Sequence, residues 1–154
     1  MPESFPSSYK TCLLQAIETI DLAKVGEAIG ILKRARAEGR QIFVCGNGGS
    51  ATTASHIACD MAKGASFGRE TRFRMMALTD SVAAITAYSN DVSYECSFAE
   101  QLKSFARAGD VVIAISSSGN SPNVLRAVEY ANSIGCQTIG LSGRDGGKLG
   151  PWRS

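Results

Sequence analysis

The sequence predicts a single doubly wound α/β domain, in which a parallel sheet carries helices on both faces. After two helical stretches, short β-rich runs alternate with helical patterns, as in βαβ units. The run VVIAI at residues 111–115 is continuously apolar, which is typical of a strand covered by helices on both faces. The 154 residues, 44% hydrophobic and 19% charged, are enough to bury one core. We expect right-handed crossovers between the strands.

Helical periodicity begins near the N-terminus. Apolar residues recur at helical spacing over residues 8–20 and again over residues 22–38, which predicts two helices. Gly39 follows the second helix as a C-cap, because glycine readily adopts the left-handed conformation that closes a helix. We therefore divide the single domain, residues 1–154, into N-terminal helices at residues 1–39 and an α/β core at residues 40–154.

The core alternates strands with helices. Between the first two strands, the glycine-bearing loop at residues 64–72 fits either a lid over a site or a plain connection. Strands are predicted at residues 41–45, 73–78, 111–115 and 137–141, and helices at residues 50–63, 81–88, 94–106 and 122–134.

Composition excludes several classes of function. The formal net charge of +2 gives no broad field for nucleic acid or an anionic membrane. No apolar run approaches the ~20 residues that cross a bilayer, and the N-terminus lacks the apolar centre of a secretory signal. The five scattered cysteines form no CxxC pair and are interpreted mostly as core residues. We expect a cytoplasmic protein without nucleic-acid or membrane partners. The densest basic cluster is interpreted as a solvated helix end, where cations complement the helix dipole. It comprises Lys33, Arg34, Arg36 and Arg40.

Two polar loops follow inner strands of the predicted sheet. In open α/β sheets, ligands bind beyond the carboxyl ends of the strands, where strand order reverses. The first, the glycine loop at residues 46–50, reads GNGGS; its glycines let bare backbone approach a ligand, and Ser50 is placed to cap the next helix. The sequence contains neither the GxGxxG dinucleotide fingerprint nor GxxxxGK[ST].

The second loop, the serine loop at residues 116–121, carries the stronger signal. It precedes Pro122, which suits the first position of a helix. Serine hydroxyls, backbone N–H groups and the positive end of a helix meet there, as a phosphate monoester requires. The alternative is a serine-rich turn with a helix cap, which explains two such loops on successive inner strands less well. The hydroxyls belong to Ser116, Ser117, Ser118 and Ser121.

A histidine, an asparagine and two acidic residues are further candidates. The only histidine, His56, precedes Asp60 by one helical turn, so both lie on one face about 5–6 Å apart at Cβ. Such a pair can bind metal or exchange protons, or it can simply stabilise the helix. Asn90 and Asp91 are placed to reach ligand hydroxyls or, equally, to end a helix.

These motifs resemble the sugar isomerase (SIS) domain and, within it, the phosphoheptose isomerase family. The likeness lies in CGNGGSATTASHIACD, SND, ISSSGNSPNV and LSGRDGGKL, and it extends over nearly the whole chain to Leu149. It implies a flavodoxin-like sheet and the conversion of sedoheptulose 7-phosphate to D-glycero-D-manno-heptose 7-phosphate for lipopolysaccharide or other surface glycans. It also implies homotetramers with active sites between subunits.

The resemblance assigns roles by motif match. Asp60 is implied as the catalytic base and, together with His56, as a zinc ligand. Ketose–aldose isomerisation proceeds through an enediolate and needs a base, a proton donor and a group that stabilises the oxyanion, which zinc could supply. The substrate-binding residues implied are Asn47, Gly48, Gly49, Asp60, Asn90 and Asp91, with Ser116, Ser117, Ser118 and Ser121 on the phosphate.

Two features depart from the family pattern. Asp60 stands where the family usually has a glutamate, whose side chain is longer by one carbon or ~1.5 Å. The chain ends GGKLGPWRS, where the family continues into a strand and a helix that supply a glutamine and a histidine. We therefore expect a C-terminally truncated core, an incomplete zinc ligand set, and an unpaired edge at strand 137–141.

Three functions remain in competition. The first is the isomerase, which His56 with Asp60 favours. The second is a non-catalytic SIS module that binds a phosphosugar or a protein partner, which the missing terminal segment favours. A regulator fused to DNA-binding elements is weaker, because the chain has no room for a helix-turn-helix domain.

Overall fold

The computed structural model describes residues 4–150, and the ending at residues 151–154 lies outside them. The chain divides after Gly30 into two compact units. The first unit holds α1 (Phe5–Glu18) and the start of α2 (Leu22–Ala37), close to the two helices predicted from apolar spacing. None of the residues of α1 is buried.

The end of α2 has the predicted C-cap. Gly39 has a φ of +65°, a left-handed conformation that side chains disfavour. Around it, the N–H of Arg40 donates to the carbonyl of Ala35 (2.8 Å), and the N–H of Gly39 donates to that of Arg36 (3.2 Å). These two bonds satisfy carbonyl groups at the end of the helix, as in a Schellman motif, so the chain leaves α2 and enters the sheet.

Four parallel strands form the sheet in the order β2-β1-β3-β4. Strand order reverses between β1 and β3, because β2 pairs on one side of β1 and β3 pairs on the other. This confirms the flavodoxin-like arrangement, and β4 lies at the predicted edge with most of its residues exposed. The strands agree with the predicted ranges to within one residue at each end and are β1 (Gln41–Gly46), β2 (Arg74–Ala77), β3 (Val111–Ser116) and β4 (Gln137–Ser142).

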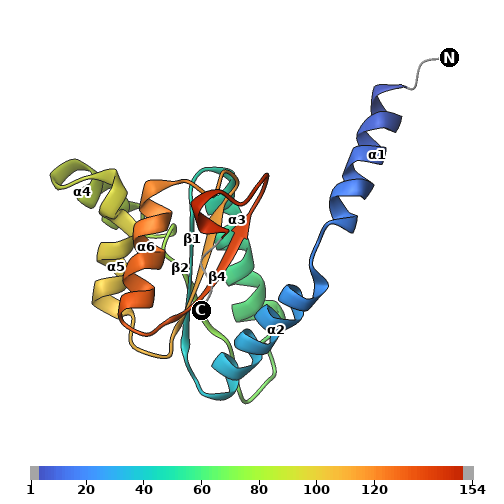
Figure 1. Ribbon diagram of the computed structural model, residues 1–154. Helices are drawn as coiled ribbons and strands as arrows, with labels where there is room; N and C mark the ends of the chain where they lie inside the picture. Colours follow the sequence, from blue (N-terminus) through green and yellow to red (C-terminus); the bar gives the residue numbers. More distant parts are fainter. Residues whose placement is uncertain (1–3, 151–154) are drawn as a thin grey trace. The chain divides into compact units, whose positions relative to one another are not determined.

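Helices connect the strands and cover both faces of the sheet (Figure 1). The predicted helix at residues 50–63 is α-helical to Cys59 and continues as a π-helical turn, and the one at residues 94–106 begins with a 3-10 turn. Among the helices of residues 4–150, none has both the length and the apolar character that crossing a bilayer requires. The remaining elements are α3 (Gly49–Cys59), η1 (Asp60–Gly64), α4 (Val82–Asp91), η2 (Tyr94–Cys96), α5 (Ser97–Phe105), α6 (Pro122–Ser133) and η3 (Gly147–Leu149).

The central strands face two separate cores. In β1, Phe43 and Cys45 pack with α5 and α6, whereas Ile42 and Val44 pack with α3 and the end of α2. Every residue of β3 is buried. Side chains alternate between the faces of a sheet, so an unbroken apolar strand means that both faces are covered. Figure 1 shows α5 and α6 on one side of the sheet and α3 on the other.

Three of the five cysteines are buried, as predicted. Burial raises the pKa of the Cys45 thiol to about 12 and that of Cys136 to about 11, where the nearby Asp110 adds to the effect. Thiols with such pKa values stay protonated at neutral pH and are poor nucleophiles. Cys96 is also buried, while the remaining two cysteines are exposed; these are Cys12 and Cys59.

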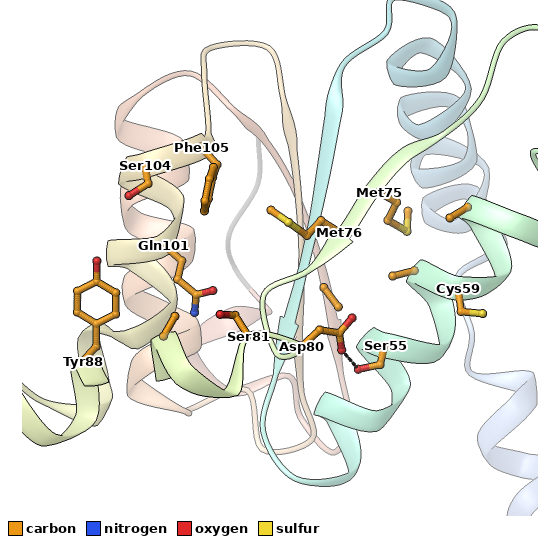
Figure 2. Close-up of a pocket in the computed structure, with 14 residues that line it drawn as sticks. Ser55, Cys59, Met75, Met76, Asp80, Ser81, Tyr88, Gln101, Ser104 and Phe105 are labelled. Carbon is orange, nitrogen blue, oxygen red and sulfur yellow. Dashed lines mark hydrogen bonds between the residues drawn. The ribbon is translucent and has the colours of Figure 1, made fainter. Parts of the chain in front are cut away.

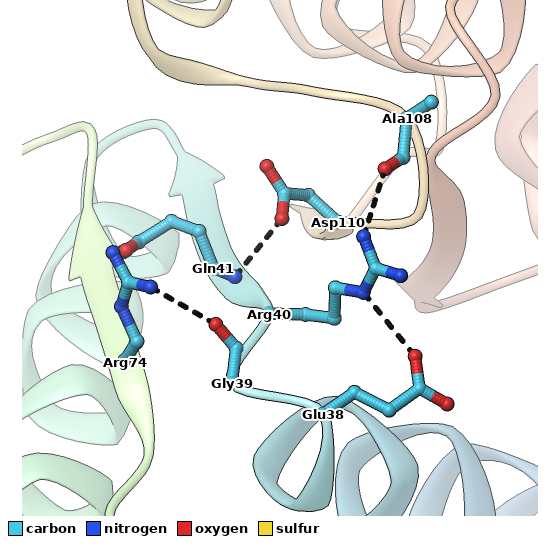
Figure 3. Close-up of polar contacts among 7 residues, drawn as sticks. All are labelled: Glu38, Gly39, Arg40, Gln41, Arg74, Ala108 and Asp110. Carbon is cyan, nitrogen blue, oxygen red and sulfur yellow. Dashed lines mark hydrogen bonds and ion pairs between the residues drawn. The ribbon is translucent and has the colours of Figure 1, made fainter.

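A polar cluster ties together the amino ends of the strands (Figure 3). The buried Asp110 accepts a hydrogen bond from the backbone N–H of Gln41 (3.0 Å). Arg40 donates through Nη1 to the carbonyl of Ala108 (3.3 Å) and pairs with Glu38 (3.2 Å). Arg40 follows the end of α2 with a side chain that is 43% exposed, so the predicted solvated helix end is confirmed, and the same side chain also bonds to the segment before β3.

Ser66 anchors the loop at residues 64–72. Its side chain is fully buried, its Oγ donates to the carbonyl of Met61 (2.6 Å), and the same Oγ accepts from the N–H of Phe73 (3.0 Å). These bonds attach the middle of the loop to the residues on both sides of it. Of the two alternatives, the connection is therefore favoured over the lid.

Candidate functional site

The glycine loop and the serine loop lie next to each other at the carboxyl edge of the sheet. Their strands pair in parallel, with Gly46 beside Ile115. The glycine loop leads from β1 into α3, and the serine loop leads from β3 into α6. Because α3 and α6 cover opposite faces of the sheet, the two loops flank the point where strand order reverses. Ligands bind at this point in open α/β sheets.

Hydrogen bonds hold the hydroxyls of the serine loop in place. Ser116 is buried, and its Oγ lies 2.9 Å from the Oγ of Ser121. The Oγ of Ser118 accepts from the N–H of Asn120 (3.2 Å), while Ser117 is exposed. Ser121 precedes α6 and makes no side-chain capping bond to it. Hydroxyls at the open N-terminus of a helix suit an anion, and phosphate binding here stays a prediction.

The glycine loop turns sharply from β1 into α3. Gly48 has a φ of +55° and is the N-cap of α3. A Cβ on Gly46 would lie 2.7 Å from the Cβ of Ser50 and 2.9 Å from the carbonyl oxygen of Ile115, so only glycine fits there. The prediction that Ser50 caps the helix is wrong, because α3 begins at Gly49 and Ser50 already lies in its first turn.

The side chain of Asn47 joins the two loops. Its Nδ2 donates to Oδ1 of Asn123 (2.8 Å), and its Oδ1 accepts from Nδ2 of Asn123 (2.9 Å). The hydroxyl of Tyr94 also donates to Asn47 Oδ1 (2.7 Å). Asn123 is only 1% exposed, so this amide pair connects the glycine loop to the buried side of α6. Most of the polar capacity of Asn47 is therefore used inside the protein.

His56 of α3 lies against Asp60, the first residue of η1, which continues the same helix. Nε2 of His56 lies 3.1 Å from Oδ2 of Asp60, and the two side chains are 74% and 69% exposed. Asp60 also begins the π-helical turn, in which the N–H of Ala65 donates to its carbonyl (2.8 Å). Such turns inside helices occur frequently at functional sites. The contact predicted from the spacing is confirmed, and its chemical role stays a prediction.

His56 and Asp60 alone do not complete a catalytic zinc site. Such sites hold the ion with three protein ligands. Within residues 4–150, no group of three or more His, Cys, Asp or Glu side chains is arranged to hold a metal ion. The described residues of one chain therefore supply only two of the three protein ligands that a catalytic zinc site needs.

Asn90 and Asp91 lie at the end of α4 and are both exposed. Nδ2 of Asn90 donates to Oδ1 of Asp91 (2.7 Å). This geometry agrees with the helix-ending role and leaves other polar atoms of both side chains open to solvent. Their contact with substrate stays a prediction.

Residues 143–150 pack against the serine loop. The N–H of Leu149 donates to the carbonyl of Gly119 (2.9 Å). A Cβ on Gly119 would lie 1.9 Å from the carbonyl oxygen of Gly146, so backbone meets backbone at this point. The serine loop cannot change its path there unless residues 143–150 move with it.

A pocket of about 850 Å³ lies along the edge strand β2, away from both loops (Figure 2). Residues of α3 line one side of it, and residues of α4 and α5 line the other. Its lining is mostly apolar and includes Met75, Met76 and Phe105, while Ser55 donates to Asp80 (2.5 Å) at its rim. The polar groups in this lining, which include Ser81, Gln101 and Ser104, belong to neither the glycine loop nor the serine loop. The loops remain the better candidate for a phosphate.

Comparison with known proteins identifies the family. The model of the SIS domain matches residues 7–143. The chain belongs to the SIS domain family. This SIS domain is 41% identical over 138 residues to the phosphoheptose isomerase of Crocosphaera subtropica. The matched region covers 90% of this chain and 70% of that relative. The SIS domain is 39% identical over 146 residues to the phosphoheptose isomerase of Aliarcobacter butzleri, which covers 92% and 74%.

Solved structures agree with this assignment. The SIS domain matches phosphoheptose isomerase GmhA from Neisseria gonorrhoeae with a TM-score of 0.81 and 33% identity, over 95% of this chain and 79% of that one. A phosphoheptose isomerase from Francisella tularensis matches with a TM-score of 0.83 and 27% identity, over 96% and 80%. The chain spans between 58% and 74% of the length of four curated relatives. It is a member of the phosphoheptose isomerase family of sugar-phosphate isomerases.

Sequence reasoning on this SIS domain missed Asn123 and Tyr94. Asn123 lies among buried α6 residues such as Val124 and Ala127, and a polar residue on a buried helix face signals an internal partner. Tyr94 lies 47 residues after Asn47, in a short 3-10 turn. No local pattern links residues that far apart, so only the folded chain shows that contact.

The contact between the serine loop and residues 143–150 of the SIS domain can be tested with Gly119→Ala. Alanine at a φ of +66° costs roughly 1–2 kcal/mol, and the overlap with Gly146 adds about 1–3 kcal/mol. Gly68→Ala is the matched control, because Gly68 has a φ of +71° and nothing within 4 Å of an added Cβ. Urea unfolding should show a clearly larger loss for Gly119→Ala, whereas equal losses would contradict the tight contact.

Proposed function

We propose that this chain converts sedoheptulose 7-phosphate to D-glycero-D-manno-heptose 7-phosphate, as a sugar-phosphate isomerase. The observation that carries the proposal is the serine loop at the N-terminus of α6, in a chain that belongs to the phosphoheptose isomerase family. The glycine loop lies beside it on the neighbouring strand. A ligand bound there would meet backbone on one side and hydroxyls on the other.

The serine loop is the proposed phosphate site. Oγ of Ser116 and Oγ of Ser121 lie 2.9 Å apart, so both hydroxyls can turn toward one group of oxygen acceptors. The N-terminus of α6 adds a partial positive charge, which favours the phosphate dianion. Ser117 and Ser118 extend the same loop, and residues 143–150 support it from one side. The phosphate would thus anchor one end of the substrate.

Asp60 is the proposed base of the reaction. In the isomerisation, a base removes the proton from C1 of the ketose, the C2 carbonyl oxygen takes a proton, and the enediol that results regains a proton at C2. The hydrogen on the C1 hydroxyl leaves as the C1 carbonyl forms. In the form of the protein without metal, Nε2 of His56, at 3.1 Å, can donate a hydrogen bond to Asp60 and hold its carboxylate in one orientation. Carbon protons are lost and regained on adjacent atoms, so a single carboxylate can serve both steps.

The isomerase assignment can be tested with purified protein and sedoheptulose 7-phosphate. Asp60→Asn should lower kcat by about a hundredfold or more, because general bases contribute that much to proton transfer. Glu129→Gln, which changes an exposed carboxylate of α6, is the control and should keep wild-type turnover. Formation of the aldose is followed by chromatography, and thermal unfolding checks that each variant is folded.

Wild-type turnover by Asp60→Asn would contradict the role of this carboxylate.

The second candidate function is a non-catalytic SIS module that binds a phosphosugar or a protein partner. The observation in its favour is that His56 and Asp60 are the only two donors at their site within one described chain. Binding of sedoheptulose 7-phosphate by the wild type without turnover would support this module over the isomerase.

The proposal includes zinc at His56 and Asp60, with a further ligand from outside the described residues of one chain. The support is the chemistry of the donors, since imidazole and carboxylate are ordinary zinc ligands. No step of the reaction above depends on the ion.

The zinc proposal predicts the metal content of the purified protein. After dialysis against zinc and then buffer, the wild type should retain zinc in proportion to protein chains, and His56→Ala should retain much less. Cys59→Ser is the matched control, because it removes an exposed thiol from the same helix. Elemental analysis measures the ratio, and equal zinc in His56→Ala and wild type would contradict the assignment.

We also propose a homo-oligomer, specifically a tetramer, in the cytoplasm, where it would serve lipopolysaccharide or surface glycan synthesis. Two observations support an oligomer: β2 is an edge strand beside an apolar pocket, and α1 has no buried residue. The substrate of the proposed reaction is a phosphorylated sugar, which supports the cytoplasmic location.

The tetramer predicts the mass of the protein in solution. Light scattering on the eluted protein should give four times the mass of one chain. Ala84→Glu should lower that mass, because Ala84 lines the apolar pocket along β2 and the substitution places a charge there. Thr86→Glu on the same helix is exposed and serves as the control. A wild-type monomer would contradict the proposal.

A further inference from the structure

The amide pair between Asn47 and Asn123 has a defined polarity. The backbone N–H of Val124 donates to Oδ1 of Asn123 (3.0 Å). A backbone N–H can only donate, so this contact identifies which atom of the Asn123 amide is the oxygen. The other atom, Nδ2, therefore faces Asn47. Asn47 must in turn present its Oδ1 to that Nδ2 (2.9 Å), and its own Nδ2 to the oxygen of Asn123 (2.8 Å).

Tyr94 completes this assignment. Its hydroxyl lies 2.7 Å from Oδ1 of Asn47 and must donate, because that atom is an oxygen without a hydrogen. An amide oxygen offers two lone pairs, and Asn123 and Tyr94 occupy both of those on Asn47. One of the two hydrogens on Asn47 Nδ2 is used by Asn123, and the other has no partner among residues 4–150. Asn47 can therefore offer a ligand one donor and no acceptor.

Burial makes this arrangement hard to reverse. If the amide of Asn47 rotated by half a turn, two oxygens would face each other on one side of the pair and two N–H groups on the other. Asn123 is 1% exposed, so water could not satisfy the mismatched groups. The pair also joins the glycine loop to α6, the helix that follows the serine loop.

We propose that Asn123 and Tyr94 are positioning residues, which hold Asn47 as a hydrogen-bond donor to an oxygen of the sugar part of the ligand. The inference rests on the proposed function only for the identity of that ligand, a sugar phosphate. An oxygen with negative or partial negative charge is the matching group, such as a carbonyl or hydroxyl oxygen close to the reacting carbons. Asn123 and Tyr94 act through Asn47 and need not touch the ligand themselves.

Tyr94→Phe tests this role with the smallest change. The variant keeps the ring and removes the hydroxyl, so Asn47 loses the donor that helps to orient its amide. The dissociation constant for sedoheptulose 7-phosphate, measured by titration calorimetry, should rise by ~5-fold to 10-fold, the usual value of one hydrogen bond. Affinity for inorganic phosphate, the probe of the serine loop alone, should stay unchanged.

Tyr88→Phe is the matched control. It removes a hydroxyl that forms no hydrogen bond within the described residues and should bind sedoheptulose 7-phosphate like the wild type. A general loss of folding would instead lower the affinity for both ligands and the midpoint of thermal unfolding. Wild-type affinity of Tyr94→Phe for the sugar phosphate would overturn the proposal.

A double-mutant cycle shows whether Tyr94 acts through Asn47. In an Asn47→Ala background, Tyr94→Phe should cause no further loss, because the side chain that Tyr94 orients is already absent. Asn47→Ser replaces Asn47→Ala if the alanine variant does not fold. A full additional loss in this background would overturn the positioning role. Turnover is measured in parallel: a wild type that binds the sugar phosphate without isomerising it contradicts the proposed reaction, while the dissociation constants still decide this inference.

Discussion

The parallel pairing of β1 with β3 is the constraint on which the rest of the site depends. The two strands are buried on both faces and lie in register from Ile42 beside Val111 to Gly46 beside Ile115, so they end at the same edge of the sheet. After that edge, the chain passes from β1 onto one face and from β3 onto the other. The glycine loop and the serine loop are adjacent for this reason, although they are far apart in the chain. Asn47 of the glycine loop and Asn123, which follows the serine loop in α6, are 76 residues apart.

Close approach at this edge selects small residues and specific polar pairs. A side chain at Gly46 would meet Ser50 and the carbonyl oxygen of Ile115, and one at Gly119 would meet the carbonyl oxygen of Gly146. Backbone therefore lies within contact distance of neighbouring backbone in both loops. The amide pair of Asn47 and Asn123 spans the two loops, so their relative position is held by hydrogen bonds as well as by the strands.

His56 and Asp60 depend on a different and more local constraint. They face each other because four residues make about one turn of a helix, and the contact needs only α3 and the first residue of η1, which continues it. Both side chains are largely exposed in the described chain. Proton transfer to and from carbon is more effective where bulk water is excluded, so the proposed role of Asp60 as a base fits the oligomer proposed above better than a single chain.

The fold class, the strands and the positions of the glycine loop and the serine loop could be predicted from the sequence, because apolar periodicity, glycines and serine-rich turns act over a few residues. The contact between His56 and Asp60 was predictable for the same reason, and so was the C-cap at Gly39. Only the tertiary structure decided that α3 begins at Gly49, that it continues as a π-helical turn at Asp60, and which partners hold Asn47. These features depend on contacts between segments that are distant in the chain or on competition among neighbouring backbone hydrogen bonds, and neither leaves a local pattern of residues.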